Sequence, residues 1–137
     1  MDENNGQVMR RAFEEIMMRG HVDAIDELFA SDFAGHDTSG GTFGREEFRE
    51  GALAMLSAFS DRKVKIADQV VGGDKVVTRW QATGVHSGEF NGIPATGRRV
   101  NLTGISIDRI AGGKIVESWE VTDDAGLLRQ LGVMPSA

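Results

Sequence analysis

The chain has 137 residues, enough to bury the core of one domain without metals or disulfides, and its lack of cysteine excludes disulfides, thiolate nucleophiles and thiolate metal sites. The formal net charge is −6 at pH 7, and the 15 Lys and Arg residues are scattered, which argues against nucleic acid and acidic lipid as partners. No basic-then-apolar leader and no apolar run of roughly 20 residues is present, so we expect one cytoplasmic domain over residues 1–137 that neither enters nor binds a membrane.

The first part of the chain predicts helices. Apolar residues in about 4–19 recur at spacings of one, three and four, which is typical of a helix with one apolar face. A short helix over about 22–29 and a longer one over about 45–59 are predicted in the same way. Between them, "SDFAGHD" predicts a brief extended segment or turn, and "TSGGTFG" predicts a loop.

After residue 60 the pattern changes to β-branched residues separated by glycines. Strands are predicted at about 62–71, 75–86, 98–110 and 115–122, with hairpin turns at "GGDK" and "AGGK" and a last short helix in "DAGLLRQLG". We therefore predict an α+β fold in which helices cover one face of a curved antiparallel sheet.

The "AGGK" hairpin decides which residues of its two strands share a face. A tight two-residue loop would pair Ala111 with Lys114 and put Trp119 on the same face as Asp108, a poor wall for a core. A three-residue turn would pair Ile110 with Lys114 and separate apolar from polar side chains better. We therefore prefer the three-residue turn.

The preferred register predicts the two faces of the hairpin. The inward face would carry Asn101, Thr103, Ile105 and Ile107 opposite Asp123, Val121, Trp119 and Glu117. The mostly polar face, with Ser106, Asp108, Ser118 and Glu120, would meet solvent or a partner subunit. Asn101 and Asp123 would then be neighbours, and Glu117 would need a cation such as Arg79 or Arg109.

Two aspartates stand side by side where the last strand meets the last helix. One carboxylate is enough to cap a helix start, because it accepts from the free N–H groups of the first turn. If Asp124 takes that role, Asp123 is free to act as a general base beside an apolar hollow. The alternative is that Asp123 itself is the cap.

Residues 88–132, "GEFNGIPATGRRVNLTGISIDRIAGGKIVESWEVTDDAGLLRQLG", resemble the SnoaL-like polyketide cyclases, or ester cyclases, of the nuclear transport factor 2-like superfamily. The matching residues include Gly92-Ile93-Pro94, Thr96-Gly97-Arg98, Gly113-Lys114-Ile115, Trp119, Asp123, Gly126-Leu127-Leu128 and Gln130-Leu131-Gly132. Upstream, His86 and His36 fit histidines of the family pattern, although "GHDT" lacks the proline that often follows.

The resemblance implies a cone-shaped domain, with a strongly curved sheet wrapped by the N-terminal helices around an apolar cavity. It also implies that Asp123 removes an acidic C–H proton from a small apolar carbonyl-containing ligand, so that the enolate closes a ring without a cofactor or metal. His86 and Asn101 are candidates to assist this catalysis, and the expected substrate-binding residues are His36, Trp80, Phe90, Ile93, Ile105 and Trp119.

Other interpretations remain open. His86 and His36 could be ordinary loop or backbone-bonded histidines, and Trp80, Ile105 and Trp119 could be core residues. The same fold could support a hydrolase or hydroxylase, or a non-catalytic module for ligand binding or dimerisation. The three histidines show no metal-ligand spacing, so we predict no metal site. Alternating apolar residues on the strands suggest a homodimer or higher homo-oligomer.

Overall fold

The computed structural model describes residues 2–134. Helix α1 (Asp2–Ala12) continues directly into a π-helix, η1 (Phe13–Met18), and the short helix α2 (Ala24–Leu28) follows. Helix α3 (Arg45–Ala58) begins after Gly44, whose N–H donates to the Glu47 carboxylate at 3.0 Å. Helix α4 (Asp124–Gln130) lies near the C-terminus.

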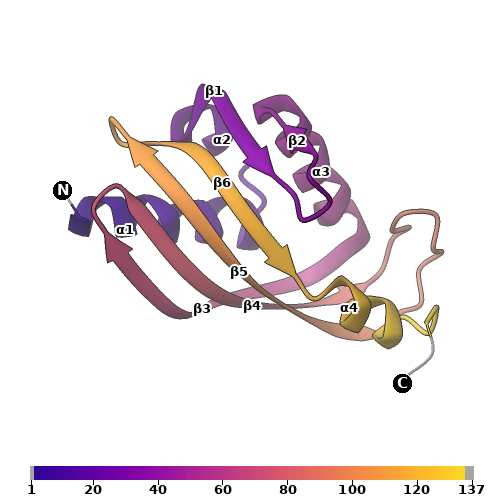
Figure 1. Ribbon diagram of the computed structural model, residues 1–137. Coiled ribbons are helices and arrows are strands. Elements are labelled where there is room, and N and C mark those ends of the chain that lie inside the picture. Colours follow the sequence, from indigo (N-terminus) through magenta and orange to yellow (C-terminus); the bar gives the residue numbers. More distant parts are fainter. Residues whose placement is uncertain (1, 135–137) are drawn as a thin grey trace.

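Six strands form one strongly curved sheet (Figure 1). The strands are β1 (Phe29–His36), β2 (Thr42–Phe43), β3 (Phe59–Gly72), β4 (Lys75–His86), β5 (Arg99–Ala111) and β6 (Lys114–Thr122), in the order β2-β1-β6-β5-β4-β3. The predicted α+β fold is confirmed. The sheet is mixed rather than antiparallel, however, because the segment predicted as a brief extended stretch is β1, which pairs parallel to β6.

The core lies between the helices and the concave face of the sheet. Ile16 of η1 and Ile25 of α2 pack there with Val76, Trp80 and Ile115 of the sheet, all of them almost fully buried. Gly104 is required at one point of this packing, since a Cβ there would lie 2.4 Å from the Trp80 ring. The apolar faces predicted for the first and third helices therefore meet the sheet as expected.

The turn predicted for the last hairpin is wrong. Gly112 and Gly113 have φ values of 58° and 77°, and Ala111 pairs with Lys114 around a tight two-residue loop. A bulge at Val116 then shifts the pairing by one residue. Beyond it Ile107 pairs with Trp119 and Ile105 with Val121.

The bulge restores the predicted composition of each face, but the predicted direction of the faces is also wrong. Ile105 and Val121 are 48% and 59% exposed, whereas Ser106 and Asp108 are only 2% and 3% exposed. The helices cover the polar face and leave the apolar one on the convex outer side. Asn101 and Asp123 do not pair as predicted, because Asp123 lies opposite Thr103 instead. The Asp123 N–H donates to the Thr103 carbonyl at 2.9 Å.

Candidate active site

A small cavity with carboxylates in its wall lies between the helices and the concave face of the sheet. Its volume is about 80 Å³, and we call it the acidic cavity. Helices α1, η1 and α3 and strand β1 supply apolar walls through Met9, Ala12, Phe13, Ile16, Met17, Phe29 and Phe48. Strands β5 and β6 supply the polar side through Ser106, Asp108, Ser118 and Glu120.

The strand register brings the polar residues together. Ser106 pairs with Glu120, and Asp108 pairs with Ser118, so the four side chains form two adjacent cross-strand pairs on one face. The Ser106 hydroxyl donates to the Asp108 carboxylate at 2.9 Å. Thr78 of β4, opposite Ser106, extends this polar row and is fully buried.

Asp108 is the more enclosed of the two carboxylates. Burial raises the pKa of Asp108 to about 6, against the opposing effect of hydrogen bonds from Ser118 and Ser106. A group that titrates this close to neutrality inside a cavity is typical of sites that transfer protons.

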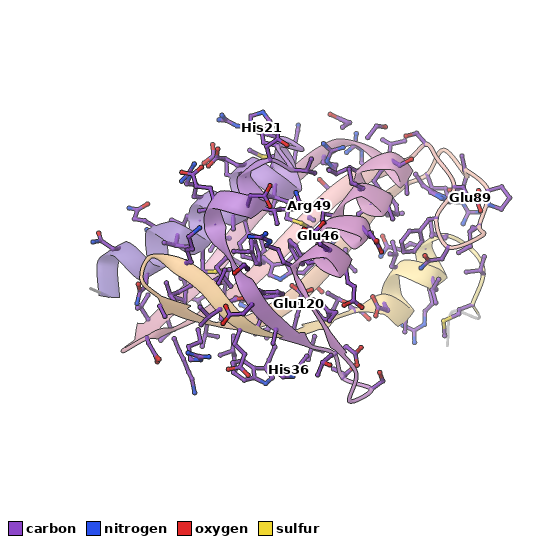
Figure 2. All side chains as sticks on the ribbon, turned by 90° about the horizontal axis from the view of Figure 1, so that it is seen from above. His21, His36, Glu46, Arg49, Glu89 and Glu120 are labelled. Atoms are coloured by element: carbon purple, nitrogen blue, oxygen red, sulfur yellow. The ribbon has the colours of Figure 1, made fainter. Side chains whose placement is uncertain are left out.

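Glu120 lies on the open side of the same cavity, and Figure 2 shows it near the middle of the molecule. Glu120 is an exposed residue, although protein atoms packed around its carboxylate partly desolvate it. This desolvation raises the pKa of Glu120 to about 7, and the negative charges of Asp108 and Asp124 raise it further. At neutral pH Glu120 is thus populated both as an acid and as a base.

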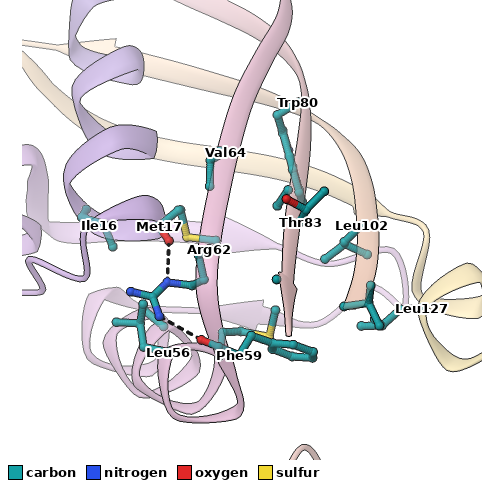
Figure 3. Close-up of a pocket in the computed structure, with 15 residues that line it drawn as sticks. Ile16, Met17, Leu56, Phe59, Arg62, Val64, Trp80, Thr83, Leu102 and Leu127 are labelled. Atoms are coloured by element: carbon teal, nitrogen blue, oxygen red, sulfur yellow. Dashed lines mark hydrogen bonds between the residues drawn. The ribbon is translucent and has the colours of Figure 1, made fainter. Parts of the chain in front are cut away.

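A second cavity of about 60 Å³, which we call the apolar cavity, lies farther along the concave face (Figure 3). Trp80 and Leu102 of the sheet, Met55 and Leu56 of α3, and Leu127 of α4 contribute to its walls. An apolar cavity is therefore present between the helices and the sheet, and Trp80 is one of the residues that line it.

Asp123 lies outside both cavities. It is exposed, and its Oδ1 accepts from the Gly126 N–H at 2.9 Å, so it caps α4. It borders a broad, open hollow of about 570 Å³ on the outer face of the sheet, beside Val121 and Ile105. Asp124, the other candidate for the cap, accepts instead from the Thr122 hydroxyl at 2.7 Å.

His86 is fully buried at the far end of β4, next to Phe59. Its Nδ1 accepts from the Thr96 N–H at 3.2 Å, which leaves the ring proton on Nε2, and Nε2 has no partner among the described residues. Phe90 and Ile93 pack on the apolar cluster that contains Phe59. These three predicted residues therefore share one end of the molecule.

His36, Trp119 and Ile105 lie on the outer side of the sheet. The His36 ring stacks on Trp119 at 5.3 Å and its Nε2 is 2.8 Å from the Glu117 carboxylate. Arg109, one of the two cations predicted for Glu117, donates to it at 3.1 Å. Both partners lower the pKa of Glu117. This cluster is separate from the acidic cavity.

Asn101 also lies away from the cavities and is exposed. Its side chain accepts from Gln81 at 3.1 Å, while its main chain exchanges hydrogen bonds with the Gln130 side chain at 2.7 Å. These hydrogen bonds between Asn101 and Gln130 link β5 to α4.

No cluster of three metal-binding side chains occurs within the described residues. Nor does any helix in that part of the chain have the length and apolar character needed to cross a membrane.

The chain thus combines an α+β fold with two carboxylates that line a cavity between its helices and its curved sheet. The chain belongs to the SnoaL-like polyketide cyclase family, whose model matches residues 7–131. No curated protein matches it in sequence.

Solved structures agree with this assignment. IdmH from Streptomyces antibioticus, a candidate polyketide cyclase, is 31% identical with a TM-score of 0.82, over 94% of this chain and 99% of that one. TsrD from Streptomyces laurentii is 29% identical with a TM-score of 0.82, over 98% of each chain. AclR from Streptomyces galilaeus, a candidate hydroxylase, shares the fold at 23% identity and a TM-score of 0.91, over 100% of this chain and 86% of that one.

Asp108 and Glu120 were not predicted as candidate site residues. The signal available was the regular alternation that places Ser106, Asp108, Ser118 and Glu120 on one face of the last hairpin. This face was assigned to solvent or a partner subunit because it is mostly polar, whereas in the structure Asp108 is buried and Glu120 is exposed.

Proposed function

We propose that the protein is a cofactor-independent cyclase or isomerase acting on a polyketide-like carbonyl compound, with Glu120 as the general base. The observation that carries this proposal is the position of Glu120 in the acidic cavity, with its pKa raised to about 7. A base whose pKa lies near the working pH is available in its charged form and still takes up a proton readily.

In the proposed reaction the Glu120 carboxylate removes a C–H proton next to a substrate carbonyl. The resulting enolate attacks a second carbonyl of the same molecule, a C–C bond forms, and Glu120 returns the proton to the new alkoxide. The cavity walls hold the substrate folded, and such positioning can lower a barrier by several kcal/mol. The Ser106 and Ser118 hydroxyls line the same cavity and hydrogen-bond to Asp108.

Asp123, the base expected from the resemblance, is the alternative to Glu120. Its Oδ1 is already engaged by the Gly126 N–H at 2.9 Å, as the cap of α4. The outer hollow beside it is open to solvent, so it does not exclude water as an enclosed site does.

Proton exchange at carbon tests both assignments. Acetone, the smallest ketone with α-protons, is incubated with the protein in deuterated water, and deuterium at its α-carbons is followed by NMR. We expect exchange with the wild type, a loss of about 10²-fold or more in Glu120→Gln, and near-normal exchange in Asp123→Asn, because asparagine caps a helix as well as aspartate does.

The opposite ranking of the two variants would make Asp123 the base. No exchange above the solvent background in the wild type would reject the carbon-acid chemistry. Oxygen from labelled water in a product would then indicate a hydrolase or hydroxylase, and tight binding without turnover would indicate a ligand-binding module.

A further inference from the structure

The chain contains two Asn-Gly pairs, Asn5-Gly6 in α1 and Asn91-Gly92 in the loop between β4 and β5. Such a pair can modify itself, because the backbone nitrogen of the glycine can attack the side-chain carbonyl carbon of the asparagine. Glycine favours this attack, since it has no Cβ to obstruct the approach or restrict its backbone. The rate then depends on how freely the two atoms can meet, and the two pairs differ strongly in this respect.

Asn91 and Gly92 form the exposed tip of a two-residue turn. The Phe90 N–H donates to the Ile93 carbonyl at 2.9 Å, and the Ile93 N–H donates back at 2.8 Å. Both tip residues have positive φ, 47° for Asn91 and 82° for Gly92, as tight hairpin turns require. This conformation is unfavourable for a residue with a side chain, so Asn91 loses little by leaving it.

The groups that would react at this tip are unhindered. The Gly92 N–H donates to no acceptor among the described residues 2–134. A Cβ placed on Gly92 would meet no atom within 4 Å, which shows that the space around the attacking nitrogen is open. Solvent therefore reaches both the nitrogen and the Asn91 side chain.

Asn5 and Gly6 are held in place on every side. Both lie inside α1, where the helix fixes the backbone dihedrals and keeps the Gly6 nitrogen from turning toward the Asn5 side chain. The Asn5 side-chain amide donates to the Gly73 carbonyl at 3.3 Å, and the Gly6 carbonyl accepts from the Gln69 side chain at 3.2 Å. Gly6 is also buried. The chain thus carries its own matched control.

We propose that Asn91 is a site of spontaneous deamidation, and that the modification opens the turn at the tip of this loop. The Gly92 nitrogen forms a bond to Cγ of Asn91, the bond from Cγ to the side-chain nitrogen breaks, and ammonia leaves with the proton of the Gly92 N–H. Water then adds to either carbonyl of the cyclic imide and breaks its bond to nitrogen. The product is aspartate or isoaspartate at position 91, and no electrons are transferred.

Isoaspartate changes the backbone as well as the charge. It carries the main chain through its side chain, which adds one carbon to a turn whose two hydrogen bonds close around two residues of normal length. Phe90 and Ile93 pack on the apolar cluster that contains Phe59, with the Phe90 and Phe59 rings 5.3 Å apart. Loss of the turn therefore releases the hold of the loop on this cluster.

The first test compares the two pairs in one sample. The protein is incubated in mildly alkaline buffer and digested with trypsin, and mass spectrometry follows the peptides 80–98 and 1–10. We expect Asn91 to deamidate about tenfold faster than Asn5, or more, in the folded protein, and the two rates to become similar in urea. Equal rates in the folded protein, or the same difference in urea, would overturn the proposal, because the fold would then not select the site.

The second test examines the turn. Each product gains a negative charge, so anion exchange separates it from the starting protein, and Asn91→Gln should give no such product because its longer side chain closes a ring poorly. In the isoaspartate fraction we expect the Phe90 and Ile93 amides to exchange hydrogen about tenfold faster or more. Fresh Asn91→Asp, which adds the charge alone, should exchange like the wild type. Unchanged exchange in the isoaspartate fraction, or equally fast exchange in Asn91→Asp, would refute the opening of the turn by the altered backbone.

Discussion

Replacing Asp108 with asparagine should change how the stability of the protein depends on pH. Burial raises the pKa of this carboxyl from its ordinary 3.8 to about 6, so the folded state holds the proton more tightly than the unfolded state. The stabilisation that this provides is fully present below pH 3.8 and is lost as the pH rises through about 6. A difference of roughly two pKa units corresponds to about 3 kcal/mol.

Urea unfolding of the wild type and Asp108→Asn between about pH 4 and 8 measures this effect. We expect the free energy of unfolding of the variant, relative to the wild type, to increase by on the order of 3 kcal/mol across this range. Altered hydrogen bonds to Ser106 and Ser118 add an offset that does not vary with pH. Relief of the Asp108 charge on Glu120 acts in the same direction.

The exposed Asp68, replaced by asparagine, is the matched control, and its stability curve should run nearly parallel to that of the wild type. Parallel curves for Asp108→Asn as well would refute the reasoning, because they would mean that Asp108 titrates alike in the folded and unfolded states.

Three further predictions concern other parts of the molecule. If Glu120 is the base, kcat/KM for α-proton exchange should rise with pH through an inflection near 7, and Asp108→Asn should move that inflection to lower pH, which a pH–rate profile measures. Gly104→Ala should lower the free energy of unfolding by about 1–3 kcal/mol in urea titrations, because the new Cβ would lie 2.4 Å from the Trp80 ring; an unchanged midpoint would show that the ring moves freely. Because apolar residues are exposed on the outer sheet face, we expect the wild type to be a homodimer and Ile105→Lys to be a monomer, as measured by light scattering. A monomeric wild type would contradict this prediction.

The order and type of most elements could be predicted from the sequence. The strands predicted at about 75–86 and 115–122 occur as Lys75–His86 and Lys114–Thr122, because glycine-rich turns mark their ends. The π-helix at Phe13–Met18 could not be predicted, since the spacing of apolar residues in one turn does not distinguish it from an α-helix.

Which face of the last hairpin points toward the helices could not be predicted either, for a different reason. Its two faces were correctly sorted into residues such as Ile105 with Trp119 and Asp108 with Glu120, but the sorting does not say which face the helices cover. We assumed that the apolar face points inward. That assumption placed Asn101 beside Asp123 on the inward face and assigned the face with Asp108 and Glu120 to solvent or a partner subunit.

The parallel pairing of β1 with β6 has a consequence for how the protein is made. Phe29 pairs with Ile115, and Lys114 donates to the Asp26 carbonyl, a residue 88 positions earlier in the chain. As the chain leaves the ribosome, β1 therefore waits for its parallel partner until almost the last strand arrives. Contacts between such distant segments form slowly, and nascent chains ending before β6 should depend on chaperones to stay soluble.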